Sequence, residues 1–366
     1  MVDLTATSTS ISSVVPKKIT EIAVNVNNYP DIHRSTMGNH ARQKYTKKNQ
    51  GLFVLPLPHQ DWEKRHGKPN LDIVAVHGLN GDCIRSWTSI SPAATGKSTT
   101  CWLNELLPHR IPRARVMTFG YNASVFGNTS IAGIRDNARS LLSHLQDGRE
   151  EEDGVADAAS ITGRPIVFVG HSLGGIIIKQ ALRIANNERN SFGDIADSTR
   201  GIVFFGTPHR GADAATWASL VSSITAAAFG NGPKSFLLKA LKPNSRDLMD
   251  LSEDFRPLSM KYAIASFVEQ DVYSGLGRVV VEKHSAVMEL PHEEVLVIGG
   301  NHSSICKFDM DDPRFEAVWR RIKRVSQGPQ IPRPPPPVMT TTVTRGLGWN
   351  TDQGWVEKWA MEERTR

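Results

Sequence analysis

Residues 165–175 of this chain read PIVFVGHSLGG, an apolar run that ends in a glycine-rich turn with Ser172 at its centre. Residues 166–169 are apolar throughout, as in a strand that is buried on both faces of a sheet. An apolar stripe at helical spacing follows from 176 to 184. Gly170 and Gly174 leave room for a sharp strand-to-helix elbow, which lifts the serine hydroxyl out of the backbone. The pattern predicts the nucleophile of a serine hydrolase.

Five more apolar runs of strand length surround this motif and are separated by segments with helical spacing. They cover residues 71–78, 114–121, 200–206, 261–269 and 293–300, and a last helical pattern covers 313–325. Six strands in alternation with helices predict an α/β-hydrolase fold, with a mostly parallel, doubly wound sheet.

A long segment between the fourth and fifth of these strands, at about 212–260, is predicted to be a helical insertion. Its residues 216–230 and 236–242 have helix-like apolar spacing. The spacing leaves open whether these helices pack on the sheet or form a mobile lid that touches lipid.

The ends of the chain differ in composition from the predicted domain at 51–326. Residues 1–50 are polar, with a basic cluster near their end, and predict a flexible tail. Residues 327–366 begin with the proline-rich run QGPQIPRPPPPV, which predicts an extended linker. The tail beyond it carries Trp349, Trp355 and Trp359, and a docking peptide, a terminal helix and an unstructured tail all remain open.

Composition argues against several classes of function. A net charge of +6 over 366 residues is modest, so nucleic acid is not an expected partner. The cysteines Cys83, Cys101 and Cys306 match no zinc or redox spacing, so neither a disulfide framework nor a metal or other cofactor is expected. The chain shows neither a secretory signal nor 18 consecutive apolar residues. We therefore expect a cytoplasmic protein, with association with a mitochondrial or endoplasmic reticulum membrane as the alternative.

A serine hydroxyl needs a general base within hydrogen-bond reach and an acid that orients the base. In this fold the acid follows a late strand and the histidine follows the last one. His302 comes directly after the last predicted strand and is the expected base. Glu269 ends the strand at 261–269 and is the first candidate for the acid, while Asp271 and Glu282 remain open.

The oxyanion of a tetrahedral intermediate needs two backbone N–H donors, one after the nucleophile and one after the early strand. Leu173 and Leu79 are the expected donors. Gly78 allows the turn that would aim the Leu79 N–H at Ser172. A metal mechanism built on His292, Glu293, Glu294 and His302 is set aside, because a predicted strand separates these groups and no zincin spacing occurs.

Several segments together resemble the serine active-site-containing, lipase-like hydrolases. They read VHGLNGD at 76–82, GHSLGG at 170–175, VFFGTPHRGA at 203–212, ASFVE at 265–269, VVVEKHSA at 279–286 and GGNHSSICKF at 299–308. The family includes fungal domains fused to NACHT or ankyrin regions and is distantly similar to GPI inositol-deacylases. The resemblance spans about residues 71–325.

The resemblance implies that Ser172 is the nucleophile, His302 the base and Glu269 the acid. Glu282 stands where the family more often has aspartate, and His209 in the GTPHRG segment is expected to pack or to form hydrogen bonds rather than to bind a ligand. Family members are esterases or lipases linked to phospholipid handling, or effector modules of fungal receptors.

Three functions follow from these patterns. The first is hydrolysis of a carboxylic ester, lipid-like by resemblance, through an acyl-enzyme on Ser172. The second is a non-catalytic or regulatory module that keeps the hydrolase frame. The third is acyl transfer by the same three residues to an acceptor other than water. An ester or lipid is the expected partner, and peripheral membrane contact and protein partners of the tails remain open.

Overall fold

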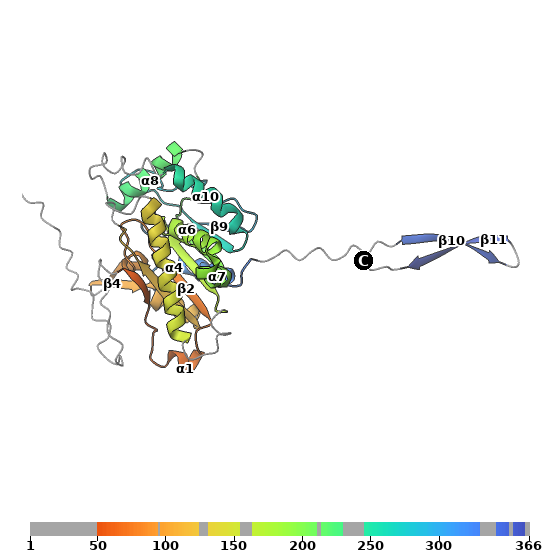
Figure 1. The fold of residues 1–366 in the computed structure, drawn as a ribbon, viewed down its shortest axis with the longest axis horizontal. Helices are drawn as coiled ribbons and strands as arrows, with labels where there is room; N and C mark the ends of the chain where they lie inside the picture. Colours follow the sequence, from red (N-terminus) through yellow and green to blue (C-terminus); the bar gives the residue numbers. More distant parts are fainter. Residues whose placement is uncertain are drawn as a thin grey trace, which may run out of the picture. The chain divides into compact units, whose positions relative to one another are not determined.

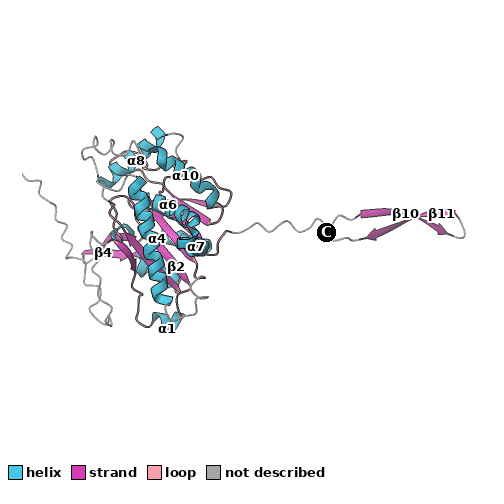
Figure 2. Cartoon of the chain, in the orientation of Figure 1, coloured by secondary structure: helices cyan, strands magenta, loops and turns pink. Residues whose placement is uncertain are grey.

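A seven-stranded sheet forms the centre of the computed structural model, which describes residues 50–93, 96–123, 131–153, 163–210, 214–229, 245–329, 342–350 and 354–362. The strand order is β1-β5-β2-β6-β7-β8-β9. The strands are β1 (Gly51–Val54), β2 (Leu71–Val76), β5 (Ala114–Gly120), β6 (Ile166–His171), β7 (Thr199–Phe205), β8 (Ala263–Glu269) and β9 (Glu293–Ile298). Among them only the edge strand β1 pairs antiparallel, with its neighbour β5. This is the α/β-hydrolase fold, with the six predicted strands in parallel (Figure 2).

Helices cover both faces of the sheet. One face carries α4 (Ile131–Asp153), α6 (Leu173–Asn187) and α7 (Arg189–Ser198), which lie together in front of the strands in Figure 1. The other face carries α2 (Trp102–Glu105), α3 (Leu107–Arg110) and α11 (Arg314–Val325). The short elements α1 (Trp62–His66) and η2 (Arg85–Trp87) lie in connections. Strands β2, β5, β6, β7 and β8 each bury alternate residues in two separate cores, because successive side chains point to opposite faces.

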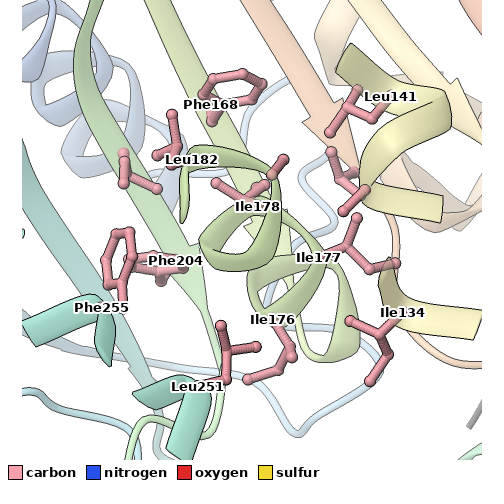
Figure 3. Packing of buried hydrophobic residues seen from close by; sticks show 14 of the residues in the cluster. Ile134, Leu141, Phe168, Ile176, Ile177, Ile178, Leu182, Phe204, Leu251 and Phe255 are labelled. Atoms are coloured by element: carbon pink, nitrogen blue, oxygen red, sulfur yellow. The ribbon is translucent and has the colours of Figure 1, made fainter. Parts of the chain in front are cut away.

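Helix α6 is packed on nearly all sides, which explains why its sequence is so apolar. Ile176, Ile177 and Ile178 at its start are buried and lie among side chains of α4, the sheet and α10 (Ser245–Ser259) (Figure 3). Three consecutive isoleucines cannot occupy a single helix face, so neighbours are needed in several directions. This packing fixes the helix that begins directly after Ser172.

The insertion contributes two helices, α8 (Ala214–Phe229) and α10 (Ser245–Ser259). Leu220 and Ile224 of α8 and Leu251 and Phe255 of α10 are buried in the same core as α6. The predicted helix at 216–230 is thus found within α8, and its described buried side chains pack on the domain. The predicted helical segment at 236–242 lies outside the described residues.

Two strand pairs have no counterpart among the sequence predictions. Strands β3 (Thr88–Ala93) and β4 (Gly96–Cys101) form one antiparallel pair, and β10 (Thr342–Asn350) and β11 (Gly354–Glu362) form another in the tryptophan-containing tail. A terminal helix at these tail positions is therefore wrong. The predicted tail at 1–49, the linker positions 330–341 and the basic cluster at 42–48 lie outside the described residues. Within the described ranges no helix combines the length and apolarity needed to cross a bilayer.

Candidate active site

The turn between β6 and α6 forces Ser172 into an unusual backbone conformation, with φ 51° and ψ −123°. A non-glycine residue at positive φ is strained and persists only where its surroundings hold it. The neighbouring glycines explain how the turn closes. A Cβ at Gly174 would lie 2.1 Å from the Val76 carbonyl oxygen, and one at Gly175 would lie 2.3 Å from Thr207 Oγ1. The sequence GHSLGG therefore forms the strained elbow that its pattern predicts.

Three side chains from distant parts of the chain meet at this elbow. His302 Nε2 lies 2.9 Å from Ser172 Oγ, and His302 Nδ1 lies 3.1 Å from Glu269 Oε1. Ser172 follows β6, Glu269 ends β8, and His302 lies in the loop after β9. Parallel strands bring their carboxyl ends to one edge of a sheet, which is why residues so far apart in sequence can converge there.

Glu269 is held by the backbone as well as by the imidazole. Its Oε1 accepts a hydrogen bond from Val281 N at 2.7 Å, and its Oε2 accepts one from Val280 N at 3.1 Å. The carboxyl side chain is fully buried. Donors that face both oxygens fix the orientation of the carboxylate toward His302 Nδ1. The valine run at 279–281 thus lies in a loop that supports the carboxylate.

The two other candidate carboxylates lie elsewhere. Asp271 Oδ2 accepts a hydrogen bond from Gly300 N at 2.8 Å, so Asp271 braces the loop that carries His302. Glu282 is exposed, and its carboxylate is 3.4 Å from His284 Nδ1. Of the three carboxylates, Glu269 is the one that the structure brings to the His302 ring.

The backbone on the other side of Ser172 comes from the turn after β2. A Cβ at Gly78 would lie 2.8 Å from Ser172 Cβ, so only glycine allows this close approach. Leu79 is the next residue in this turn. Leu173 is the first residue of α6, where N–H groups have no partner within the helix. Leu173 thus directly follows Ser172, and Leu79 directly follows the glycine that packs against it. Their role as oxyanion donors stays a prediction.

His171, the residue before Ser172, was not singled out from the sequence. Its Nε2–H donates a hydrogen bond of 2.8 Å to the backbone carbonyl of His302. This bond fixes the loop that carries His302. Burial lowers the pKa of His171 to about 3, which keeps the ring neutral. His171 and His302 are 131 positions apart, so no local sequence pattern indicates this hydrogen bond. The place of His171 within GHSLGG is its one sequence signal.

His77 is a second buried histidine beside the site. Its ring stacks on Tyr121 with centroids 4.3 Å apart, and the Tyr121 hydroxyl donates to the His77 carbonyl at 2.7 Å. Burial lowers the pKa of His77 to about 4. The neutral ring can therefore donate from Nδ1 to the Gly78 carbonyl, 3.0 Å away, and stabilise the turn that leads to Leu79.

These histidines predict that the protein loses stability in mild acid. In the unfolded chain an imidazole binds a proton near pH 6.5, whereas folded His77 and His171 resist protonation until about pH 4 and about pH 3. The unfolded state then holds more protons below pH 6.5, so the free energy of unfolding should fall by about 1.4 kcal/mol per pH unit for each such ring. Urea denaturation at pH 7, 6 and 5 measures the free energy of unfolding. This pH range lies above that in which most carboxylates titrate. A free energy that stays constant across this range would contradict the prediction.

The side chains of His292, Glu293 and Glu294, which a metal mechanism would require, each contact a different partner. His292 Nε2 contacts the Ser259 carbonyl at 3.2 Å, Glu293 Oε1 accepts a bond of 2.6 Å from Ser266, and Glu294 pairs with Arg324 at 2.6 Å. Across the described residues, no group of three or more histidine, cysteine, aspartate or glutamate side chains is placed to hold a metal ion.

Comparisons with known proteins find distant relatives of this chain. Protein SERAC1 of Bos taurus is 28% identical over 294 residues, which cover 74% of this chain and 41% of that protein. Protein SERAC1 of Danio rerio is 26% identical over 288 residues, which cover 74% of this chain and 40% of that protein. The chain thus spans about two fifths of the length of these relatives. Both relatives are animal proteins, and the resemblance to fungal hydrolase domains stays a prediction.

Among solved structures, a mature lipase of Bacillus licheniformis, BlEst2, is similar with a TM-score of 0.41 and 20% identity over 74% of this chain and 99% of that one. No family model matches the chain.

Proposed function

We propose that this protein hydrolyses carboxylic esters through an acyl-enzyme formed on Ser172. One observation carries the proposal: an unbroken series of contacts runs from Ser172 Oγ through the two nitrogens of His302 to Glu269. It is supported by the strained conformation of Ser172, which holds the hydroxyl at the turn between strand and helix.

In the first half of the reaction His302 would act as general base. Its Nε2 takes the proton of Ser172 as the hydroxyl oxygen attacks the ester carbonyl carbon, and Glu269 stabilises the imidazolium through Nδ1–H. The carbonyl oxygen becomes an oxyanion, for which the N–H groups of Leu79 and Leu173 are the proposed donors. The tetrahedral intermediate then collapses, the C–O bond to the alcohol breaks, and His302 returns its proton to the leaving alkoxide.

The second half repeats these steps with water. His302 removes a proton from a water molecule, whose oxygen attacks the acyl carbon, and Ser172 leaves with the proton that His302 returns to it. The products are a carboxylic acid and the regenerated serine. An alcohol in place of water would give acyl transfer with the same residues, and analysis of products formed with added alcohols distinguishes the two outcomes. The proposal that the acyl group is lipid-like rests on the family resemblance.

Active-site labelling tests the proposal directly. We expect a fluorophosphonate probe to modify the intact protein at Ser172, as read from the mass of the labelled peptide, because an activated serine attacks phosphorus as it attacks an acyl carbon. Ser172→Ala should abolish labelling. Ser303→Ala is the matched control, since Ser303 is an exposed serine directly after the base, and it should be labelled like the wild type. An unlabelled wild type, or labelling that survives in Ser172→Ala, would overturn the proposal.

A further inference from the structure

A second polar site lies along α6, away from Ser172. It is a cavity of about 160 Å³ between α6, the loop after β7 and α10. Lys179, on α6, follows Ser172 by seven residues, which places it two turns, or about 10 Å, further along the helix. The polar side chains that line the cavity are Lys179, His209, Arg210, Ser252, Glu253 and Arg256. We call it the Lys179–His209 pocket.

Lys179 carries a buried amine without a close counterion. Its side chain belongs to a residue that is only 1% exposed. In the described part of the chain no carboxylate lies within ion-pair distance of it, and Glu293, the acid that acts on it electrostatically, already accepts hydrogen bonds from Ser266 and Met288 N. Burial lowers the pKa of Lys179 to about 7. A buried ammonium group is costly unless an anion compensates it, so this position favours an anionic ligand.

His209 adds two unused hydrogen-bonding atoms to the same cavity. The residue is 2% exposed, and neither ring nitrogen has a hydrogen-bond partner among the described residues. The hydroxyl of Ser252 is likewise without a partner there. The ring is held in place, because its backbone N–H donates to the Ser285 carbonyl at 2.6 Å and its edge packs on Phe204. Such atoms are rare in folded proteins and indicate a missing partner.

The protonation of His209 narrows the chemistry of that partner. Burial, and then the nearby Lys179, lower the pKa of His209 well below its usual value, so the ring is neutral. A neutral imidazole has one donor and one acceptor nitrogen. A ligand that satisfies both must accept one hydrogen bond and donate another.

The mouth of the pocket is also basic. Arg210 and Arg256 are exposed at its edge, where Arg256 is anchored by a hydrogen bond of 2.7 Å to the Met288 carbonyl and Arg210 pairs with Glu289. Glu253 is the one acidic side chain among the lining residues. Because Glu289 compensates Arg210, the lining offers a buried amine and the Arg256 guanidinium group against the Glu253 carboxylate, which favours one negative charge.

We infer that the Lys179–His209 pocket binds a compact oxyanion of the monohydrogen phosphate class, either free phosphate or a phosphomonoester headgroup. The anion compensates the Lys179 ammonium group, and its oxygens accept hydrogen bonds from one His209 nitrogen and from Ser252. The P–OH group, which free phosphate keeps as HPO4²⁻ and a phosphomonoester keeps as its monoanion, donates to the other His209 nitrogen, which a fully ionised sulfate cannot do. Binding here is separate from the chemistry at Ser172 and does not depend on it.

Calorimetric titration of the full chain at pH 7 tests this inference, with sodium phosphate and glycerol 3-phosphate as the two titrants at constant ionic strength. We expect saturable binding of at least one of them, weaker binding of sulfate, and a loss of at least tenfold in affinity in Lys179→Met, which keeps the length of the side chain and removes its charge. Tighter binding of glycerol 3-phosphate would indicate an esterified headgroup, and tighter binding of phosphate the free ion.

Two further variants keep the test decisive. Lys323→Met makes the same change at an exposed position of α11 and should bind like the wild type. Arg256→Gln alters an exposed residue at the mouth, so the fold should survive, and affinity should fall several-fold. Absence of saturable binding by the wild type, or undiminished binding in both Lys179→Met and Arg256→Gln, would overturn the inference. Labelling of Ser172 by the fluorophosphonate probe is unaffected by either result, so the two proposals fail independently.

Discussion

Replacement of His302 by alanine should lower kcat for a short-chain ester by on the order of a millionfold, because a triad without its base loses almost all of its nucleophilic catalysis. Replacement of Glu269 by glutamine should cost on the order of ten-thousandfold. The glutamine keeps the shape of the side chain but can present an NH2 group to His302 Nδ1, which favours the wrong tautomer. Initial rates with a chromogenic ester, measured at enzyme concentrations that reveal a slow residual rate, provide the comparison.

The same experiment distinguishes the three candidate acids. Glu282→Gln is the matched control for Glu269→Gln, since the chemical change is identical and Glu282 is exposed, and its rate should stay close to that of the wild type. Asp271→Asn should also retain most activity, because the asparagine oxygen can still accept the hydrogen bond from Gly300 N. A loss in either control as large as in Glu269→Gln would show that Glu269 is not the acid, provided that circular dichroism shows all variants folded.

The sheet could be predicted from sequence because five of its six parallel strands, β2, β5, β6, β7 and β8, are buried on both faces, whereas Val295 and Val297 of β9 are exposed. A strand that is buried on both faces reads as a continuous apolar run, and each of the six predicted runs overlaps an observed strand. Strand β1 was missed because it has only four residues at an edge and its burial alternates. The pair β3 and β4 was missed because Thr88–Ala93 and Gly96–Cys101 are rich in serine and threonine and carry no apolar period.

Residues of the candidate site could be predicted where the fold fixes their order along the chain. Contacts between side chains that are distant in sequence could not be predicted. Ser172, Glu269 and His302 each end or follow a strand, so chain order alone suggested that they converge. The hydrogen bond from His171 to the His302 carbonyl left no trace in local pattern. Lys179 likewise falls within an apolar helical stripe, where a lysine is ordinarily expected to reach solvent.

Asp72 stands out as a charged residue within the buried strand β2, and we expect Asp72→Asn to lower the free energy of unfolding by about 3–5 kcal/mol. The residue is fully buried. Its carboxylate lies 2.8 Å from Arg115 Nε on the neighbouring strand, 2.6 Å from Arg149 on α4 and 3.1 Å from Arg164 before β6. The asparagine keeps the shape but removes the charge that compensates these guanidinium groups, two of which are themselves buried. Urea denaturation at pH 7 measures the change.

Asp61→Asn is the matched control, because Asp61 pairs with Lys64 at 2.9 Å on the surface, where such a pair contributes less than about 1 kcal/mol. A loss of similar size in both variants would contradict the expected role of the buried cluster.

The substitution at Asp72 should not change the reactivity of Ser172 in the folded protein. Asp72 lies near the start of β2 and Gly78 follows its carboxyl end, so at about 3.3 Å per residue the cluster is roughly 20 Å from the elbow. Below its midpoint of unfolding, folded Asp72→Asn should therefore react with the fluorophosphonate probe at the wild-type rate, because Asp72 acts on the sheet that carries Ser172 and not on the serine itself.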